Sequence, residues 1–133
     1  MREVRLAELW REMAADSFSA AGGLFSGTGH LRSALSRAYY AAYARVVTSL
    51  LQSDVVLPSR GNPGHRRLPA LILNNLKGVS GARAARVCGA IDTLYKLRLV
   101  ADYQADAVVD ETDARVSFSL MGRVFKDLKE ALL

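Results

Sequence analysis

Arg98, Asp102 and Tyr103 form the group of residues best suited to chemistry in this chain. Asp102 follows Arg98 by four residues, a spacing that places both side chains on one face of a helix and favours an ion pair. A guanidinium fixed in this way can hold phosphate oxygens, and a tyrosine hydroxyl can donate to them as well. Three roles are open for the group: contact with a nucleic-acid phosphate in binding or catalysis, a buried polar network that joins its helix to Tyr40 or Arg37, and a surface for a protein partner.

Basic residues are concentrated in one part of the chain. Residues 17–91 contain nine basic residues and one acidic residue, a local charge of +8 in a chain whose net charge is +5. Arginine supplies most of this charge, and its planar guanidinium suits bidentate phosphate contacts and stacking on bases. Two interpretations are open, a solvated basic surface and a face that binds a polyanion.

His65 and Cys88 are the other residues with reactive side chains. His65 stands in a segment rich in Gly and Pro, beside Arg66 and Arg67, so we expect an exposed imidazole that changes charge near a pH of about 6.5. A surface histidine without function is the alternative. Cys88 has no histidine near it in the sequence, which favours a buried structural thiol over a nucleophile. The only other histidine is His30, and neither histidine follows a glutamate at metal-ligand spacing, so we expect no metal and no cofactor.

The spacing of apolar residues predicts the elements that must position these groups. The predicted helices are an amphipathic one that ends before Gly22, a central one from about Gly29 to Gln52, a short one from Leu68 that closes at Gly78, one from about Gly81 that carries Arg98, and one that begins near Asp110. Residues 116–120 alternate as a strand would, but a single strand has no pairing partner in a helical chain. The predicted fold class is therefore all-α, an antiparallel up-and-down bundle of four long helices plus one short helix.

Length and composition limit the protein class. A chain of 133 residues corresponds to one domain, and its single cysteine, Cys88, excludes an intrachain disulfide. We expect a cytoplasmic location on that basis. The first ten residues resemble no signal peptide, and the most apolar stretch, residues 34–51, is interrupted by Arg37 and Arg45. We therefore expect a soluble protein that does not associate with membranes.

Two segments of the chain resemble the HEPN domain superfamily (higher eukaryotes and prokaryotes nucleotide-binding). Residues 37–41 are similar to the Arg-Ala-Tyr-Tyr-Ala helix of these domains. Residues 94–103 resemble the Leu-x-x-x-Arg-x-x-Ala-Asp-Tyr segment that one branch carries in its penultimate long helix, and His65 matches a histidine often found before the third helix of that branch. The resemblance spans about residues 22–133 and implies an up-and-down helical bundle.

The resemblance implies a protein that acts on RNA. Many members of the superfamily are metal-independent endoribonucleases that dimerise, often encoded beside a nucleotidyltransferase in toxin-antitoxin or phage-defence pairs. Arg98 matches the arginine of their Arg, four to six residues, His signature, but Tyr103 stands where the histidine is expected, and tyrosine, with a pKa of about 10, is a poor base at neutral pH. The same spacing occurs from Arg60 to His65, outside the family's position.

These implications give a set of expected sites and partners. We expect Arg98 to anchor a phosphate, with Tyr103 or His65 assisting transesterification, and Asp102 to form the structural pair of Arg98. The expected RNA contacts are Arg37, Tyr40, Arg60, Arg66 and Arg67. RNA, a second copy of the chain and a nucleotidyltransferase are the expected partners. A non-catalytic helical module that binds a nucleotidyltransferase or another protein is the alternative, and RNA binding without cleavage is a third possibility.

Overall fold

The computed structural model describes residues 2–27, 30–58 and 63–129, and the regular elements in these ranges are all helices. The elements are α1 (Arg2–Gly27), α2 (Leu31–Gln52), the 3-10 helix η2 (His65–Arg67), α3 (Leu68–Asn75), α4 (Gly81–Tyr103) and α5 (Glu111–Lys129). The all-α prediction is confirmed. Residues 116–120 lie within α5, so the helical interpretation of this segment is also confirmed.

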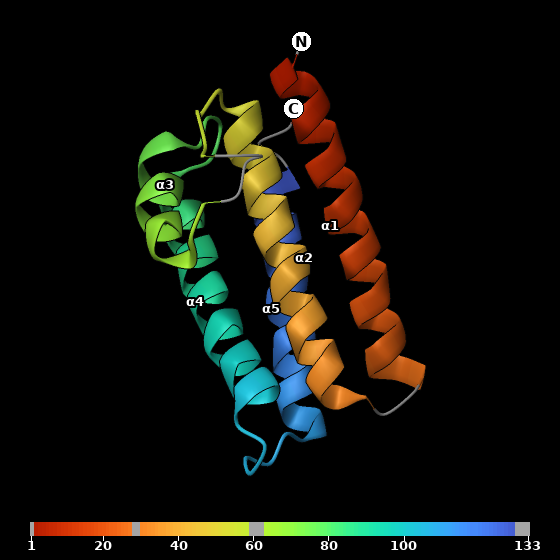
Figure 1. Ribbon diagram of the computed structural model, residues 1–133. Coiled ribbons are helices and arrows are strands. Elements are labelled where there is room, and N and C mark those ends of the chain that lie inside the picture. Colours follow the sequence, from red (N-terminus) through yellow and green to blue (C-terminus); the bar gives the residue numbers. More distant parts are fainter. Residues whose placement is uncertain (1, 28–29, 59–62, 130–133) are drawn as a thin grey trace.

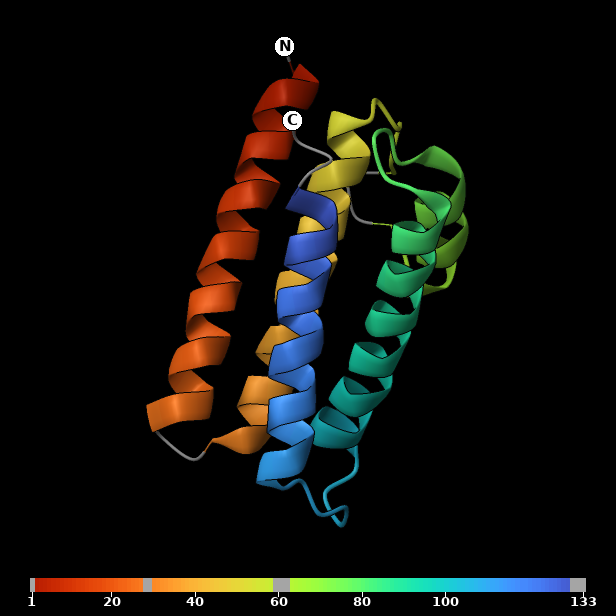
Figure 2. The same cartoon turned by 180° about the vertical axis from the view of Figure 1, so that it is seen from behind.

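The four long helices alternate in direction along the chain (Figure 1). In this view α2 lies between α1 and α4, α5 runs behind α2, and the short α3 lies beside the first half of α4. Figure 2 shows the opposite side, where α5 lies between α1 and α4. The arrangement is the predicted antiparallel up-and-down bundle of four long helices plus one short helix.

The central position of α2 follows from its composition. Its buried face carries five alanines, which favour the helix and allow neighbouring helices to approach closely: Ala34, Ala38, Ala41, Ala42 and Ala44. Larger side chains from the neighbours fill the space around α2, and those below 2% exposure include Leu68, Ile72, Ile91, Leu94, Met121 and Leu128. Because α2 contacts α1, α4 and α5, its side chains can join residues from all three.

The predicted end of the first helix is wrong, because α1 continues through Gly22 and Gly23 to Gly27. A glycine in a helix costs about 1 kcal/mol relative to alanine. Packing outweighs that cost here: Ala21 is buried, and a Cβ at Gly22 would lie 3.5 Å from the Phe118 ring of α5. Helix contacts between distant parts of the chain therefore override the local signal.

Polar groups close both ends of α4. The Ser80 hydroxyl accepts a hydrogen bond from the backbone N–H of Arg83 at 3.2 Å and caps the start of α4. At the other end of α4, Arg32 donates to the carbonyl oxygens of Ala101 at 2.9 Å and Gln104 at 3.0 Å, and also to that of Ala107. These bonds place a cation at the negative end of the helix dipole.

Candidate functional site

Arg98 lies at the junction of α2 and α4, held by one residue from each helix. Its Nε donates to Asp102 Oδ2 at 3.1 Å, and its Nη2 donates to the Tyr40 hydroxyl at 2.8 Å. Ser36 of α2 donates to the same Asp102 oxygen at 3.3 Å. The side chain of Arg98 is 16% exposed and that of Asp102 is 29% exposed, so the pair is mostly but not fully covered. The expected pairing of Arg98 with Asp102 is present, and the contact with α2 is made through Tyr40.

Tyrosine rings surround the guanidinium. Its central carbon lies 4.9 Å from the ring centroid of Tyr40, 5.6 Å from that of Tyr39 and 5.9 Å from that of Tyr103. These distances are within the range of cation–π attraction. The described part of the chain offers no hydrogen-bond acceptor to Nη1 of Arg98. The group is therefore fixed in orientation while it retains donors for an anion.

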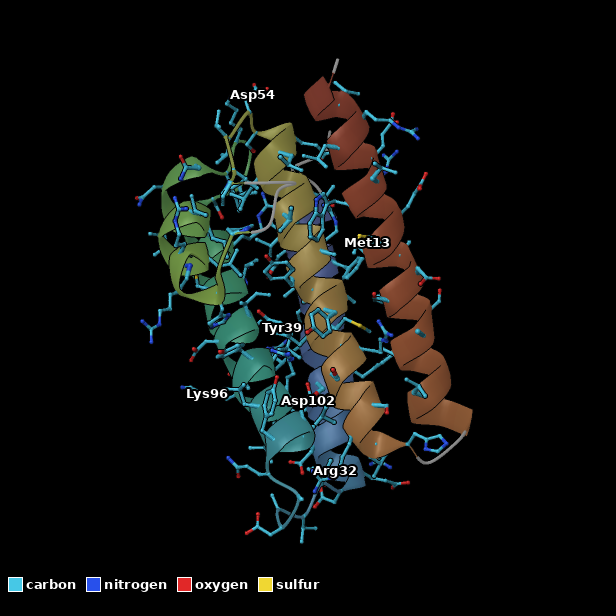
Figure 3. All side chains as sticks on the ribbon, in the orientation of Figure 1. Met13, Arg32, Tyr39, Asp54, Lys96 and Asp102 are labelled. Atoms are coloured by element: carbon cyan, nitrogen blue, oxygen red, sulfur yellow. The ribbon has the colours of Figure 1, made fainter. Side chains whose placement is uncertain are left out.

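Tyr103 is the last residue of α4 and is 70% exposed. Its ring contacts the guanidinium of Arg98, and much of its side chain faces solvent. Figure 3 shows Tyr39 on α2 and Asp102 on α4, in the part of the bundle where these helices run side by side. A phosphate bound at this junction can reach both a cation and a phenolic donor.

The His65 side chain is mostly buried, so the prediction of an exposed imidazole is wrong. Its ring stacks on Tyr95 of α4 with centroids 3.7 Å apart and planes at 9°, and its side chain is 17% exposed. Its Nδ1 lies 3.2 Å from the Tyr39 hydroxyl, and its Nε2 lies 4.0 Å from an Asp92 oxygen. Burial lowers the pKa of His65, and the Asp92 charge acts in the opposite direction.

Tyr39 connects His65 to Arg98. Its hydroxyl contacts His65, and its ring contacts the guanidinium of Arg98. Burial raises the pKa of Tyr39 well above its ordinary value, and neighbouring tyrosines add to this effect against the opposing charge of Arg98. Tyr39 therefore stays protonated at neutral pH and acts as a neutral bridge. His65 and Arg98 belong to one cluster, although no direct contact joins them.

The remaining predicted contacts divide into three groups. Arg37 is exposed and makes no hydrogen bond or ion pair with the described residues, and Tyr40 is 40% exposed. Arg66 and Arg67 are exposed on η2, and no described contact joins them to Arg98. Arg60 lies outside the described residues.

Two neighbouring pockets meet at Arg37 and Tyr40. The first has a volume of about 430 Å³ and is lined mainly by polar groups of α2 and α4, including Ser36 and Asp102. The second has a volume of about 360 Å³, lies between α1 and α2, and has a largely apolar lining. The two side chains shared by both pockets are therefore the boundary between a polar and an apolar site.

The sequence pattern does not indicate Tyr39, Tyr95 or Asp92 as parts of the site. Tyr39 belongs to the regular apolar spacing of α2, so the sequence pattern assigns it to the core, where its ring in fact is. The available signal was the number of hydroxyl-bearing rings: a core helix with Tyr39, Tyr40 and Tyr43 must find partners for buried hydroxyls.

The chemistry of other reactive groups is limited. The Cys88 thiol is partly buried and lies 3.6 Å from the Pro69 carbonyl oxygen, and burial raises its pKa, which disfavours the nucleophilic thiolate. No group of three or more His, Cys, Asp or Glu side chains in the described ranges is placed to hold a metal ion. Over the same ranges, no helix has the length and apolar character needed to cross a membrane.

Comparison with known proteins identifies one family. The model of the HEPN domain matches residues 7–131 of this chain, which includes every residue of the site described above. No curated protein and no solved structure matches the chain.

Proposed function

Because the chain belongs to the HEPN domain family, we propose that it acts on RNA and binds a phosphate at the junction of α2 and α4. The observation that carries the proposal is Arg98, held by Asp102 and Tyr40 with Nη1 left for a ligand. The family supports a role related to nucleotides or RNA. The geometry supplies the donors that a phosphodiester needs.

The charges around the polar pocket favour an anion. Arg32, Arg37 and Asp102 line the pocket, and Arg98 is bonded to Asp102. Three arginines and one aspartate give a local charge of +2. Arg37 contributes most readily, because it is exposed and no described residue neutralises it. A phosphodiester would gain a cation without displacing an existing ion pair.

We also propose that the bound RNA is cleaved without a metal ion. The ribose 2′-oxygen would lose its proton to solvent and attack phosphorus, and the bond to the 5′-oxygen would break, leaving a cyclic phosphate. Arg98 would stabilise the charge on the phosphorane, and the Tyr103 hydroxyl would donate the proton that the leaving 5′-oxygen takes up. His65 would help to position Arg98 indirectly, because it contacts the Tyr39 hydroxyl and the Tyr39 ring contacts the guanidinium.

The proposal extends to a biological setting. The protein would be the effector of a toxin-antitoxin or phage-defence pair, act in the cytoplasm as a homodimer, and have a nucleotidyltransferase as its partner. The resemblance of residues 37–41 and 94–103 to that branch of the family supports this extension.

Binding and cleavage of single-stranded RNA test the proposal. Wild-type protein should bind RNA at low salt and cleave it in EDTA. Arg37→Ala should weaken binding several-fold and reduce its salt dependence by about 0.7 in log–log slope, the value for one lost phosphate contact. Arg123→Ala is the matched control, because Arg123 is also exposed and has no described partner, yet lines neither pocket.

Arg98→Ala separates a functional from a structural role. Loss of cleavage with a melting temperature within a few degrees of wild type would support phosphate contact. Unfolding of Arg98→Ala together with unchanged RNA affinity of Arg37→Ala would instead show that the network is structural.

The alternative is a non-catalytic module that binds a protein partner. Exposed apolar side chains on α1 favour it, since Val4 is 62% exposed, Leu9 41% and Met13 54%. Absence of RNA affinity at low salt, together with tight binding to a purified nucleotidyltransferase encoded beside this protein, would favour the module.

A further inference from the structure

We propose that the apolar pocket between α1 and α2 binds a base of the RNA whose phosphate lies in the polar pocket. This inference rests on the proposed function and adds a second subsite to it. The pocket has a volume of about 360 Å³, within the range of small-molecule sites, and lies next to the polar pocket through Arg37 and Tyr40. A nucleotide with its base in one pocket and its phosphate in the other would fit this arrangement.

Aromatic rings form much of the pocket. Trp10 of α1 and Tyr43 of α2 have ring centroids 5.9 Å apart and planes tilted by 59°, and Tyr40 adds a third ring. Proteins bind single-stranded nucleic acid by stacking bases on such side chains. Tyr43 is 8% exposed, and burial raises its pKa to about 12, so it presents a neutral ring at physiological pH.

The pocket has a closed floor and an open rim. Ser17, Tyr43 and Ala44 are buried at the floor, with exposed fractions of 9%, 8% and 2%. At the rim, Met13 is 54% exposed and Tyr40 is 40% exposed. Figure 3 shows Met13 on the middle part of α1, next to α2. A flat ring can therefore enter from solvent and be covered on several sides.

Charge explains why the occupant should be a base of a nucleic acid rather than an apolar peptide. Arg37 lines both pockets and has no described partner, so a ligand that joins an apolar ring to an anion satisfies it. The floor offers few polar groups, which are the Ser17 and Tyr43 hydroxyls, and Tyr43 already donates to the Pro63 carbonyl oxygen at 2.6 Å. Binding should thus depend on stacking and vary little among bases.

Trp10 provides a direct readout, because it is the only tryptophan in the chain. The experiment compares a short oligoadenylate with an abasic ribose-phosphate oligomer of the same length at low salt. Anisotropy of end-labelled oligomers measures affinity, and intrinsic fluorescence reports contact with Trp10. The oligoadenylate should bind at least about fivefold more tightly and quench Trp10, because each stacked base contributes measurably to affinity. The abasic oligomer should bind through its phosphates without quenching.

Two variants of one residue locate the effect. Ser17→Leu fills the floor and should lower oligoadenylate affinity to that of the abasic oligomer, whereas Ser17→Ala removes only the hydroxyl and should retain the difference. Melting temperatures report whether each variant folds. If Ser17→Leu does not fold, quenching of wild-type Trp10 by free adenosine decides the question, since adenosine carries no phosphate.

The possible results separate this inference from the proposed function. Equal affinity for both oligomers, or a folded Ser17→Leu protein that keeps the full difference, would overturn the base pocket while RNA binding stands. No binding of either oligomer would overturn both proposals. If Ser17→Leu is unfolded and free adenosine does not quench Trp10 of the wild-type protein, the base pocket is also overturned.

Discussion

Tyr103 is the most exposed residue of the proposed site, and its ring contacts the guanidinium of Arg98. Tyr103→Phe retains the ring contact and removes the proton that cleavage would use. We expect the cleavage rate in EDTA to fall by about 100-fold or more, the usual contribution of a general acid, while RNA affinity changes less than about twofold. Rates from single-turnover assays, with anisotropy for affinity, measure both. Equal cleavage rates in wild type and variant would remove Tyr103 from the mechanism.

The environment of His65 predicts a pH-dependent contribution to stability. Burial lowers the pKa of His65 below its unfolded value of about 6.5, so the unfolded state binds the proton more readily. Its contribution is therefore complete above pH about 6.5 and is lost as pH falls through the lower folded pKa. His65→Phe keeps an aromatic ring on Tyr95 and cannot titrate. The free energy of unfolding, measured with urea from about pH 8 down to about pH 5, should fall more steeply for wild type than for the variant.

Parallel pH curves for the two proteins would contradict this view of His65. The comparison isolates His65 from His30 and the carboxylates, because those groups are present in both proteins.

The site was only partly predictable from the sequence. The Arg98–Asp102 pair follows from a spacing of four residues, which a helix turns into proximity. The position of His65 does not follow, because its neighbours in sequence are polar while its neighbours in space are Tyr39 and Tyr95. Contacts between residues far apart in the chain determine burial, and local composition does not predict these contacts.

Arg32 joins the start of α2 to the end of α4 through its side chain. Arg32→Gln would leave carbonyl oxygens at Ala101 and Gln104 without their charged donor. We expect the free energy of unfolding to fall by about 1–2 kcal/mol, because a partly buried cation at a helix C-terminus contributes up to about 2 kcal/mol. Urea denaturation measures the loss, and hydrogen exchange at the end of α4 should accelerate. Arg115→Gln is the control, because the Arg115–Glu111 pair is exposed and should contribute little.

A fall in stability no larger than that of the control would show that the carbonyl oxygens are adequately solvated without Arg32.

The helices themselves were largely predictable, because apolar spacing of three to four residues fixes which face of each is buried. Val124 and Leu128 of α5 are fully buried, as the spacing predicts. The end of α1 was not predictable, because Gly22 indicates a break locally, whereas packing against Phe118 continues the helix. Propensity gives way to packing where a helix lies along its neighbours.

The basic charge of the molecule should govern its affinity for RNA. Residues 17–91 have a charge of +8, more than the net charge of +5, and the exposed basic residues of that segment include Arg37, Arg66 and Arg67. If these three and Arg98 each contact one phosphate, the logarithm of the association constant should fall with the logarithm of salt concentration with a slope of about −3. Titrations at several potassium chloride concentrations measure the slope. Affinity that is independent of salt would contradict an electrostatic interface.

The directions of the helices determine which elements lie at each end of the bundle. α1 begins and α5 ends at the same end, whereas α4 reaches Tyr103 at the opposite end (Figure 1). A biotin or an affinity tag joined close to the start of α1 or the end of α5 can therefore fix the molecule to a sensor surface with Tyr103 directed outward. Ligands can be passed over such a surface in turn, and the same immobilised sample serves for every buffer.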